Sequence, residues 1–360
     1  MSVILAVLAG AAASALSFLS IDVSDAVLRT AAVSAIIIAA FFIQLIIHES
    51  GHLIFGLLSG YRFSSFRILS FLIKKEGDRL TLKKLRLSGT AGQCLMAPPD
   101  PVEGRIPYVL YNLGGVLMNL VSAVLSVLVC ILIGPERKGW LFLAVLAIAG
   151  IYLALTNGIP SGGGAVPNDG YNAVNLGKDP EAADSFWKQL KVSQKQSEGI
   201  RLKDMPEEWF RLSDGADLNN PLIAAVAVFA ENRYMDCGDF SKAEEKIRLL
   251  TSEDVSLAPL YRALLANDKV YIEALEKGTD TDLSPIRDKE TASILKQMKG
   301  FPSVIRTEYA IASLVDKDAV KAGSALKAFE KAAKSYPYPV EIETERELIR
   351  TAGNMISSED

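Results

Sequence analysis

Both histidines of the chain fall in one apolar stretch, QLIIHESGHLIFGLL, at residues 44–58. They are His48 and His52, four residues apart, and Glu49 stands beside the first of them. Residues at this spacing on a helix lie on one face, one turn above each other, so the two imidazoles can hold one zinc ion. Glu49 lies about 100° further round the helix, from where its carboxylate can reach a water on the ion and take its proton. The pattern is HExxH, and it indicates metal-assisted hydrolysis.

The apolar surroundings of this motif favour a functional role for its ionisable side chains. Ionisable side chains within a long apolar segment are costly and usually serve a function. The alternative is that His48 and His52 are interior residues that bond to their neighbours. That alternative leaves Glu49 unexplained.

A catalytic zinc ion usually has three protein ligands and one open position. Since the chain has only two histidines, we expect a carboxylate as the third ligand. The segment NGIPSGGGAVPNDGYNAVNL, residues 157–176, follows an apolar run and contains Asp169. The alternative is that Asn168 or Asp169 only caps the following helix. We favour Asp169 as the third metal ligand.

Four apolar segments must position these residues, and a membrane-spanning helix needs about 20 apolar residues. They are residues 3–19, 32–58, 108–133 and 140–157. The first contains the small-residue run AAASA of a signal peptide but lacks a basic region before it, so we favour a retained helix over a cleaved one.

Lysine and arginine predict the orientation of these segments. The loop at residues 60–107 is strongly basic, whereas the loop between the first two segments holds only Arg29. We therefore place the basic loop in the cytoplasm, together with both ends of the chain. The basic residues of this loop are Arg62, Arg67, Lys74, Lys75, Arg79, Lys83, Lys84, Arg86 and Arg105.

The same loop predicts a β-hairpin. FRILSFLIKK and RLTLKKLRL flank the turn sequence EGD. An edge strand here could pair with an unwound substrate backbone by β-augmentation. The hairpin could also bind anionic lipid headgroups through its lysines, and the two roles are compatible.

The sequence after about residue 179 is charged and predicts a soluble all-α domain. Two stretches have the spacing of the second helix of a tetratricopeptide repeat, but they lie too far apart for a regular repeat. The mild net charge of −4 argues against a general nucleic-acid binder. Three scattered cysteines without a CxxC pair suggest neither a disulfide framework nor a cysteine metal site. The repeat-like positions are Ala325, Phe329, Ala332 and Pro337, and, more weakly, Ala243, Ile247 and Leu250.

Over residues 32–175 the chain resembles the site-2 proteases, which are intramembrane zinc metalloproteases. HESGH matches the HExxH motif of that family, including the glycine before the second histidine. GGVLMN, residues 114–119, is similar to its GPxxN segment, with Val116 where proline is usual. NGIP…PNDG is similar to its NxxPxxxxDG motif, with the additional residues SGGGAV in between.

The resemblance implies that zinc is the cofactor and assigns roles to six residues. His48, His52 and Asp169 would bind the ion, and Glu49 would act as the base. The resemblance also implies that Asn119 and Asn157 help to hold the substrate or the transition state. The alternative for both asparagines is hydrogen bonding between helices.

We therefore expect a mostly α protein with a polytopic membrane core of about four helices, a small β-hairpin and a degenerate tetratricopeptide-like domain. Residues 1–178 would form the protease domain and residues 179–360 a cytoplasmic helical domain. The expected function is regulated intramembrane proteolysis of a membrane-anchored protein in a bacterial cell membrane. The helical domain would bind a protein partner, and nucleic acid is not expected to be a partner. The alternative is an inactive pseudoprotease or scaffold that binds clients.

Overall fold

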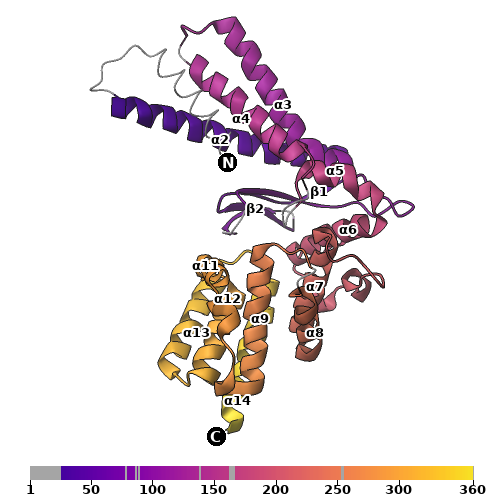
Figure 1. Cartoon of the computed structure of the whole chain (residues 1–360), viewed down its shortest axis with the longest axis vertical. Helices are drawn as coiled ribbons and strands as arrows, with labels where there is room; N and C mark the ends of the chain where they lie inside the picture. Colours follow the sequence, from indigo (N-terminus) through magenta and orange to yellow (C-terminus); the bar gives the residue numbers. More distant parts are fainter. Residues whose placement is uncertain are drawn as a thin grey trace. The chain divides into compact units, whose positions relative to one another are not determined.

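The structure is a computed structural model that describes residues 26–77, 79–85, 87, 90–137, 139–161, 167–252 and 255–359. It is mostly helical, with one small antiparallel sheet (Figure 1). The expected first apolar segment, residues 3–19, lies outside these residues. The chain forms two compact units. The first holds the described residues up to Ser59 together with residues 108–160 and 168–173, and the second holds the remainder.

Among the described residues, three long helices build the first unit: α2 (Ala26–Leu58), α3 (Tyr108–Ile133) and α4 (Trp140–Gly158). Each is long and apolar enough to cross a membrane, which confirms the second, third and fourth apolar segments as candidate spans. With 33 residues, α2 is about 50 Å long, more than the roughly 30 Å of a hydrocarbon core. It begins six residues before the expected start at residue 32.

The first unit buries several polar side chains and exposes many large apolar ones. On α3, Asn112, Asn119 and Ser126 are buried and recur every seven residues, which places them on one face. Large apolar side chains on another face of α3 are exposed, and Leu132 is 83% exposed. Such extensive exposed apolar faces are unusual in a water-soluble bundle and fit helices that are surrounded by lipid. It supports the interpretation of the chain as a membrane protein.

Between α2 and α3 the chain forms a four-stranded antiparallel sheet of order β3–β2–β1–β4. The strands are β1 (Arg62–Ile68), β2 (Phe71–Glu76), β3 (Arg79–Lys84) and β4 (Gly92–Ala97). The predicted hairpin is present as β2 and β3, in which Ile73 faces Leu82. The stretch FRILSFLIKK also holds the end of β1 and the turn before β2. The chain reverses after Ile68, which pairs with Phe71, and Leu69 takes a positive φ of 53° in the turn.

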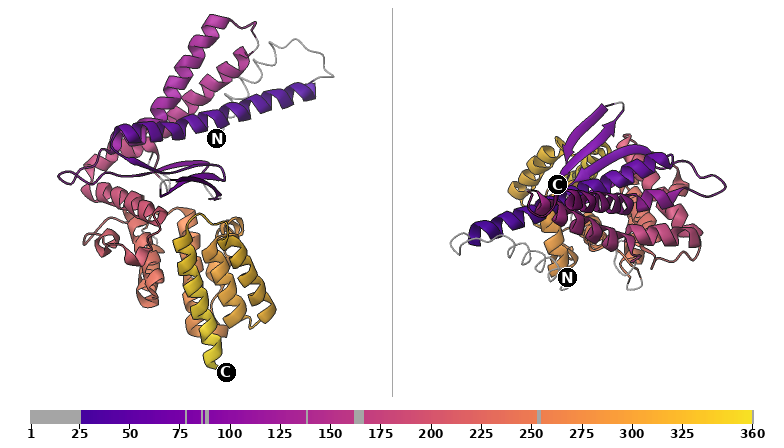
Figure 2. Two further views of the ribbon diagram at one scale, coloured as in Figure 1. Left: turned by 180° about the vertical axis from the view of Figure 1, so that it is seen from behind. Right: turned by 90° about the horizontal axis from the view of Figure 1, so that it is seen from above.

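The remaining helices belong to the second unit, except that α5 starts in the first. The interior of the second unit is an apolar core in which Ala243, Ile247, Ala325 and Phe329 are all buried. Helix α7 packs against α8 and α12 against α13, while the tetratricopeptide-like character stays a prediction. Figure 2 shows α14, in yellow, ending at the C-terminus. The helices are α5 (Asp169–Asn175), α6 (Pro180–Ser197), α7 (Pro221–Cys237), α8 (Phe240–Leu250), α9 (Pro259–Lys277), α10 (Ser284–Arg287), α11 (Lys289–Gln297), α12 (Pro302–Ala310), α13 (Ala319–Ala333) and α14 (Pro339–Glu359).

A buried lysine attaches the sheet to the helices of the second unit. Lys74 of β2 is 2% exposed, and its ammonium group donates a hydrogen bond to the Pro337 carbonyl over 2.9 Å. The same group lies 4.7 Å from the centre of the Tyr338 ring, just before α14. These contacts connect the sheet to the later helices within the same compact unit. The predicted boundary between residues 178 and 179 separates a membrane-embedded protease domain from a cytoplasmic domain, and it stays a prediction.

Candidate metal centre

Helix α2 places both histidines on one buried face. His48 is 6% exposed and His52 is 8% exposed, and their Nε2 atoms lie 3.2 Å apart. The i, i+4 spacing on a regular helix is sufficient to produce this convergence. The predicted pairing of the two imidazoles is therefore present in the structure.

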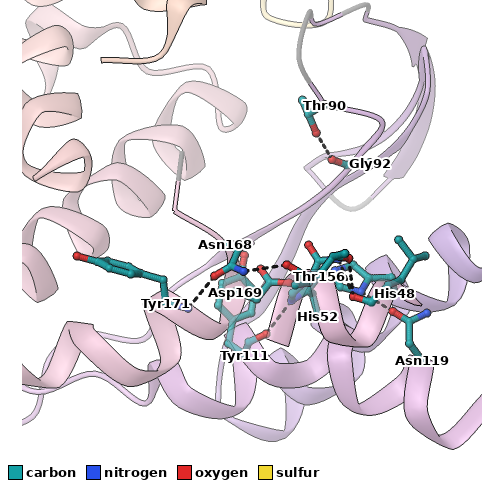
Figure 3. Close-up of polar contacts among 12 residues, drawn as sticks. His48, His52, Thr90, Gly92, Tyr111, Asn119, Thr156, Asn168, Asp169 and Tyr171 are labelled. Atoms are coloured by element: carbon teal, nitrogen blue, oxygen red, sulfur yellow. Dashed lines mark hydrogen bonds and ion pairs between the residues drawn. The ribbon is translucent and has the colours of Figure 1, made fainter. Parts of the chain in front are cut away.

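Asp169, the first residue of α5, completes the group (Figure 3). Its Oδ2 atom lies 3.1 Å from His48 Nε2 and 3.4 Å from His52 Nε2. Zinc ligands at about 2.0–2.1 Å in a tetrahedron are about 3.3–3.4 Å from one another. The three donor atoms thus have the spacing that a tetrahedral zinc ion requires. Among the described residues, they form the one group of histidine, cysteine and carboxylate side chains that could hold a metal ion.

The outer nitrogen of each imidazole is fixed by a hydrogen-bond acceptor. His52 Nδ1 lies 2.8 Å from the backbone carbonyl of Tyr111, and His48 Nδ1 lies 2.7 Å from the side-chain oxygen of Asn119. Each Nδ1 therefore carries a proton and donates it, which leaves Nε2 for the metal. Metal-binding histidines usually have such an outer partner, so the donor set fits zinc.

The surroundings of Asp169 favour the ionised carboxylate, the form that binds a metal. Burial has the largest effect and would raise its pKa. When the imidazoles of His48 and His52 carry a proton on Nε2, their hydrogen bonds and charge interactions with the carboxylate outweigh burial and lower its pKa to about 2. A bound metal ion would replace those protons as the positive charge.

Asn168, and not Asp169, caps helix α5. The Asn168 side-chain oxygen accepts a hydrogen bond from the Tyr171 backbone N–H at 2.9 Å, as an N-cap residue does. Its amide nitrogen donates to the carbonyls of Thr156 and Ile159, which attaches α5 to the end of α4. Asp169 can therefore point to the histidines (Figure 3).

Glycines allow the backbones around the centre to approach closely. A Cβ on Gly51 would lie 2.2 Å from the carbonyl oxygen of Gly114, so α2 and α3 cross at this pair. A Cβ on Gly170 would lie 2.1 Å from the carbonyl oxygen of Gly158, so the Asp-Gly pair packs directly on the end of α4. Gly115 has a different function, because its missing side chain leaves room for the ring of His48.

Replacing Gly115 by alanine should weaken metal binding. A Cβ there would lie 2.5 to 2.7 Å from three atoms of the His48 ring, so the ring would have to move. We expect zinc affinity, measured by competition with a chelator, to fall by about the 10–100-fold that follows loss of an outer partner. Gly323→Ala is the matched control because a Cβ at that position meets nothing within 4 Å. Equal zinc affinity in both variants would contradict this account of Gly115.

Glu49, Asn119 and Asn157, the other predicted site residues, belong to the first unit. Glu49 is 6% exposed and lies beside His48 on α2. Asn119 is fully buried and bonds to His48 and to Gln44. The Asn157 amide nitrogen donates to the Leu153 carbonyl one turn earlier in α4, at 2.9 Å.

Gln44 was not predicted from the sequence, although a signal was present. Gln44 precedes His48 by four residues, so it continues the face that carries both histidines, and it is fully buried. No protein-family model, no curated protein and no solved structure matches the chain. The candidate metal centre is therefore defined by the residues of this chain alone.

Proposed function

We propose that the chain is a membrane-embedded zinc endopeptidase that cleaves a membrane-anchored protein within or near its transmembrane segment. One observation carries the proposal. Two imidazole nitrogens and a carboxylate oxygen converge within 3.4 Å of one another, beside a buried glutamate on a helix that can span a membrane. Three protein ligands with a neighbouring glutamate are the arrangement expected of a catalytic rather than a structural zinc site.

When bound, a zinc ion lowers the pKa of water to about 7 and polarises a carbonyl oxygen. His48, His52 and Asp169 would hold the ion, and their fixed outer contacts keep the two Nε2 atoms available for it. Glu49 would accept the proton of the attacking water and then pass it to the nitrogen of the leaving amine. The ligands provide three donor atoms, which leaves a fourth tetrahedral position for the reaction.

The location of the centre supports a membrane-anchored substrate. A transmembrane helix hides its peptide bonds in its own hydrogen-bond ladder, so it must unwind before water can attack. An extended peptide can be held by pairing with an exposed sheet edge. Strands β3 and β4 are the edges of the sheet, and β3 carries Leu80 and Leu82 at 66% and 67% exposure. The proposal includes strand pairing at this sheet as the means of substrate binding.

The decisive test is zinc content together with cleavage. Purified wild-type protein in detergent or lipid should contain about one zinc ion per chain and should cleave transmembrane reporter substrates. Loss of both after treatment with a chelator, and their return with added zinc, would support the proposal. Bound zinc with no cleavage of any substrate would favour the pseudoprotease. Absence of zinc from freshly purified protein would contradict the proposal.

We also propose that the C-terminal residues lie in the cytoplasm, because the basic loop predicts that orientation. A fluorescent reporter that matures only in the cytoplasm, fused after Asp360, should therefore fluoresce. The matched control is a phosphatase reporter that is active only after export, fused at the same position. Phosphatase activity without fluorescence would overturn the orientation and would put the catalytic centre nearer the opposite face of the membrane.

A further inference from the structure

Gln44 is a fully buried polar side chain in the apolar helix α2, one turn before His48. Burying an amide away from water costs free energy unless its donors and acceptors have partners. In lipid, that requirement is stricter because no water can replace a missing partner. The contacts of Gln44 therefore explain why a glutamine can occupy this position.

The donor end of the Gln44 side chain faces α4 and α3. Its amide nitrogen donates to the backbone carbonyl of Leu146 over 2.9 Å and to the hydroxyl of Ser122 over 3.1 Å. A backbone carbonyl can only accept, so Leu146 determines which end of the Gln44 amide faces it. Gly150 provides the room, because a Cβ at that position would lie 2.7 Å from the Gln44 amide nitrogen.

The acceptor end of Gln44 faces Asn119. The Asn119 amide nitrogen donates to the Gln44 side-chain oxygen over 2.8 Å and to the Gln44 backbone carbonyl over 2.9 Å. With its donor end held by two acceptors, Asn119 must present its oxygen to His48 Nδ1, which lies 2.7 Å away. The direction of donation is therefore the same at each step, from His48 to Asn119 to Gln44 to Leu146.

We infer that Gln44 is a positioning residue for the metal centre, which acts through Asn119 to keep a proton on Nδ1 of His48 and so keep Nε2 available for a metal ion. The inference rests on the proposed function only in naming the ion as the group that Nε2 binds. His52 provides an internal comparison, because its Nδ1 is held by the Tyr111 carbonyl and not by Gln44. Asn119 thus orients a metal ligand, a role different from the substrate contact that the resemblance implies.

The test uses Gln44→Met in the full-length protein, because methionine is unbranched, similar in length and lacks the amide. The chain contains only two histidines, so ¹⁵N-histidine labelling produces signals from His48 and His52 alone. In the wild type, with or without metal, both Nδ1 atoms should carry protons that exchange slowly with solvent. In Gln44→Met the His48 Nδ1 proton should exchange faster, while that of His52 should not change.

Zinc affinity provides the second measurement. Gln44→Met should bind zinc about 10-fold more weakly, the lower end of the range for outer partners, because the Gln44 backbone carbonyl still holds Asn119. Asn119→Leu should lose more, and adding Gln44→Met to it should cause little further loss, because residues that act as one unit are not additive. Ser122→Ala is the matched control, since Gln44 still donates to the Leu146 carbonyl in that variant. Gln44→Glu should bind zinc more tightly than Gln44→Met when its carboxyl is protonated, because the protonated carboxyl can both donate to Leu146 and accept from Asn119.

The outcomes separate this inference from the proposed function. Unchanged exchange at His48 and unchanged zinc affinity in Gln44→Met would overturn the inference even if the wild type is an active protease. Full additivity with Asn119→Leu would also overturn it, because Gln44 would then act only on helix packing. A wild type that binds zinc but cleaves nothing would remove the protease proposal and leave the inference standing. If the wild type binds no zinc, faster exchange of the His48 Nδ1 proton in Gln44→Met would still support the inference, and unchanged exchange would overturn it.

Discussion

Glu49→Gln should abolish cleavage and leave zinc bound. Glutamine has nearly the same shape as glutamate but cannot accept the proton of the attacking water at neutral pH. Loss of a positioned general base usually lowers the rate by about 10²–10⁴-fold, and we expect a decrease of at least that size. The three converging ligand atoms belong to His48, His52 and Asp169, so metal content should remain near that of the wild type.

Metal analysis and single-turnover cleavage of a transmembrane substrate measure the two effects separately. Glu136→Gln is the matched control, because it makes the same chemical change at an exposed turn between α3 and α4. That variant should retain wild-type activity and zinc. Near-normal turnover by Glu49→Gln would exclude Glu49 as the base. A metal-free Glu49→Gln protein would instead assign Glu49 to the ligand set.

The histidine pair was predictable because its geometry is local. A helix over an apolar segment and a spacing of four residues are sufficient to bring His48 and His52 together. The second to fourth apolar segments were predictable for a similar reason, since length and composition alone decide whether a helix can span a membrane. Local rules therefore predicted the apolar helices and two of the three side chains that converge at the candidate metal centre.

The remaining features depend on contacts between segments that are far apart in the sequence. Asp169 is 121 residues from His48, and geometry alone did not distinguish it from a helix cap. The structure assigns the cap to Asn168 instead. Gln44 was missed because its partners, Asn119 and Leu146, lie on other helices.

The sheet was also only partly predictable, because the turn between β1 and β2 lacks the residues that mark a turn most strongly. Strands β1 and β2 meet at a turn where Leu69 has a positive φ, which bulky residues rarely adopt. No glycine, proline or asparagine marks that reversal, so the sequence predicted the hairpin of β2 and β3 but not the turn between β1 and β2. Strand β4 pairs with β1 across the intervening hairpin, a pairing that no local pattern specifies.

Asp169→Asn should remove both zinc and activity. The carboxylate oxygen of Asp169 lies within 3.4 Å of both Nε2 atoms, and a neutral amide is a poor replacement for a carboxylate as a zinc ligand. Two imidazoles alone would remain. We expect zinc affinity to fall by more than the 10–100-fold that loss of an outer partner causes. Chelator competition and metal analysis on the purified variant measure this loss directly.

The chain contains a matched control for the capping alternative. Asp179 is a helix cap, since its carboxylate accepts hydrogen bonds from the backbone N–H groups of Glu181 and Ala182 at the start of α6. Asparagine and aspartate cap about equally well, so Asp179→Asn should keep its stability, zinc and activity. If Asp169 were also only a cap, Asp169→Asn would behave in the same way. A zinc-loaded and active Asp169→Asn protein would therefore reject Asp169 as a ligand, whereas loss of zinc in that variant alone would assign the third ligand to its carboxylate.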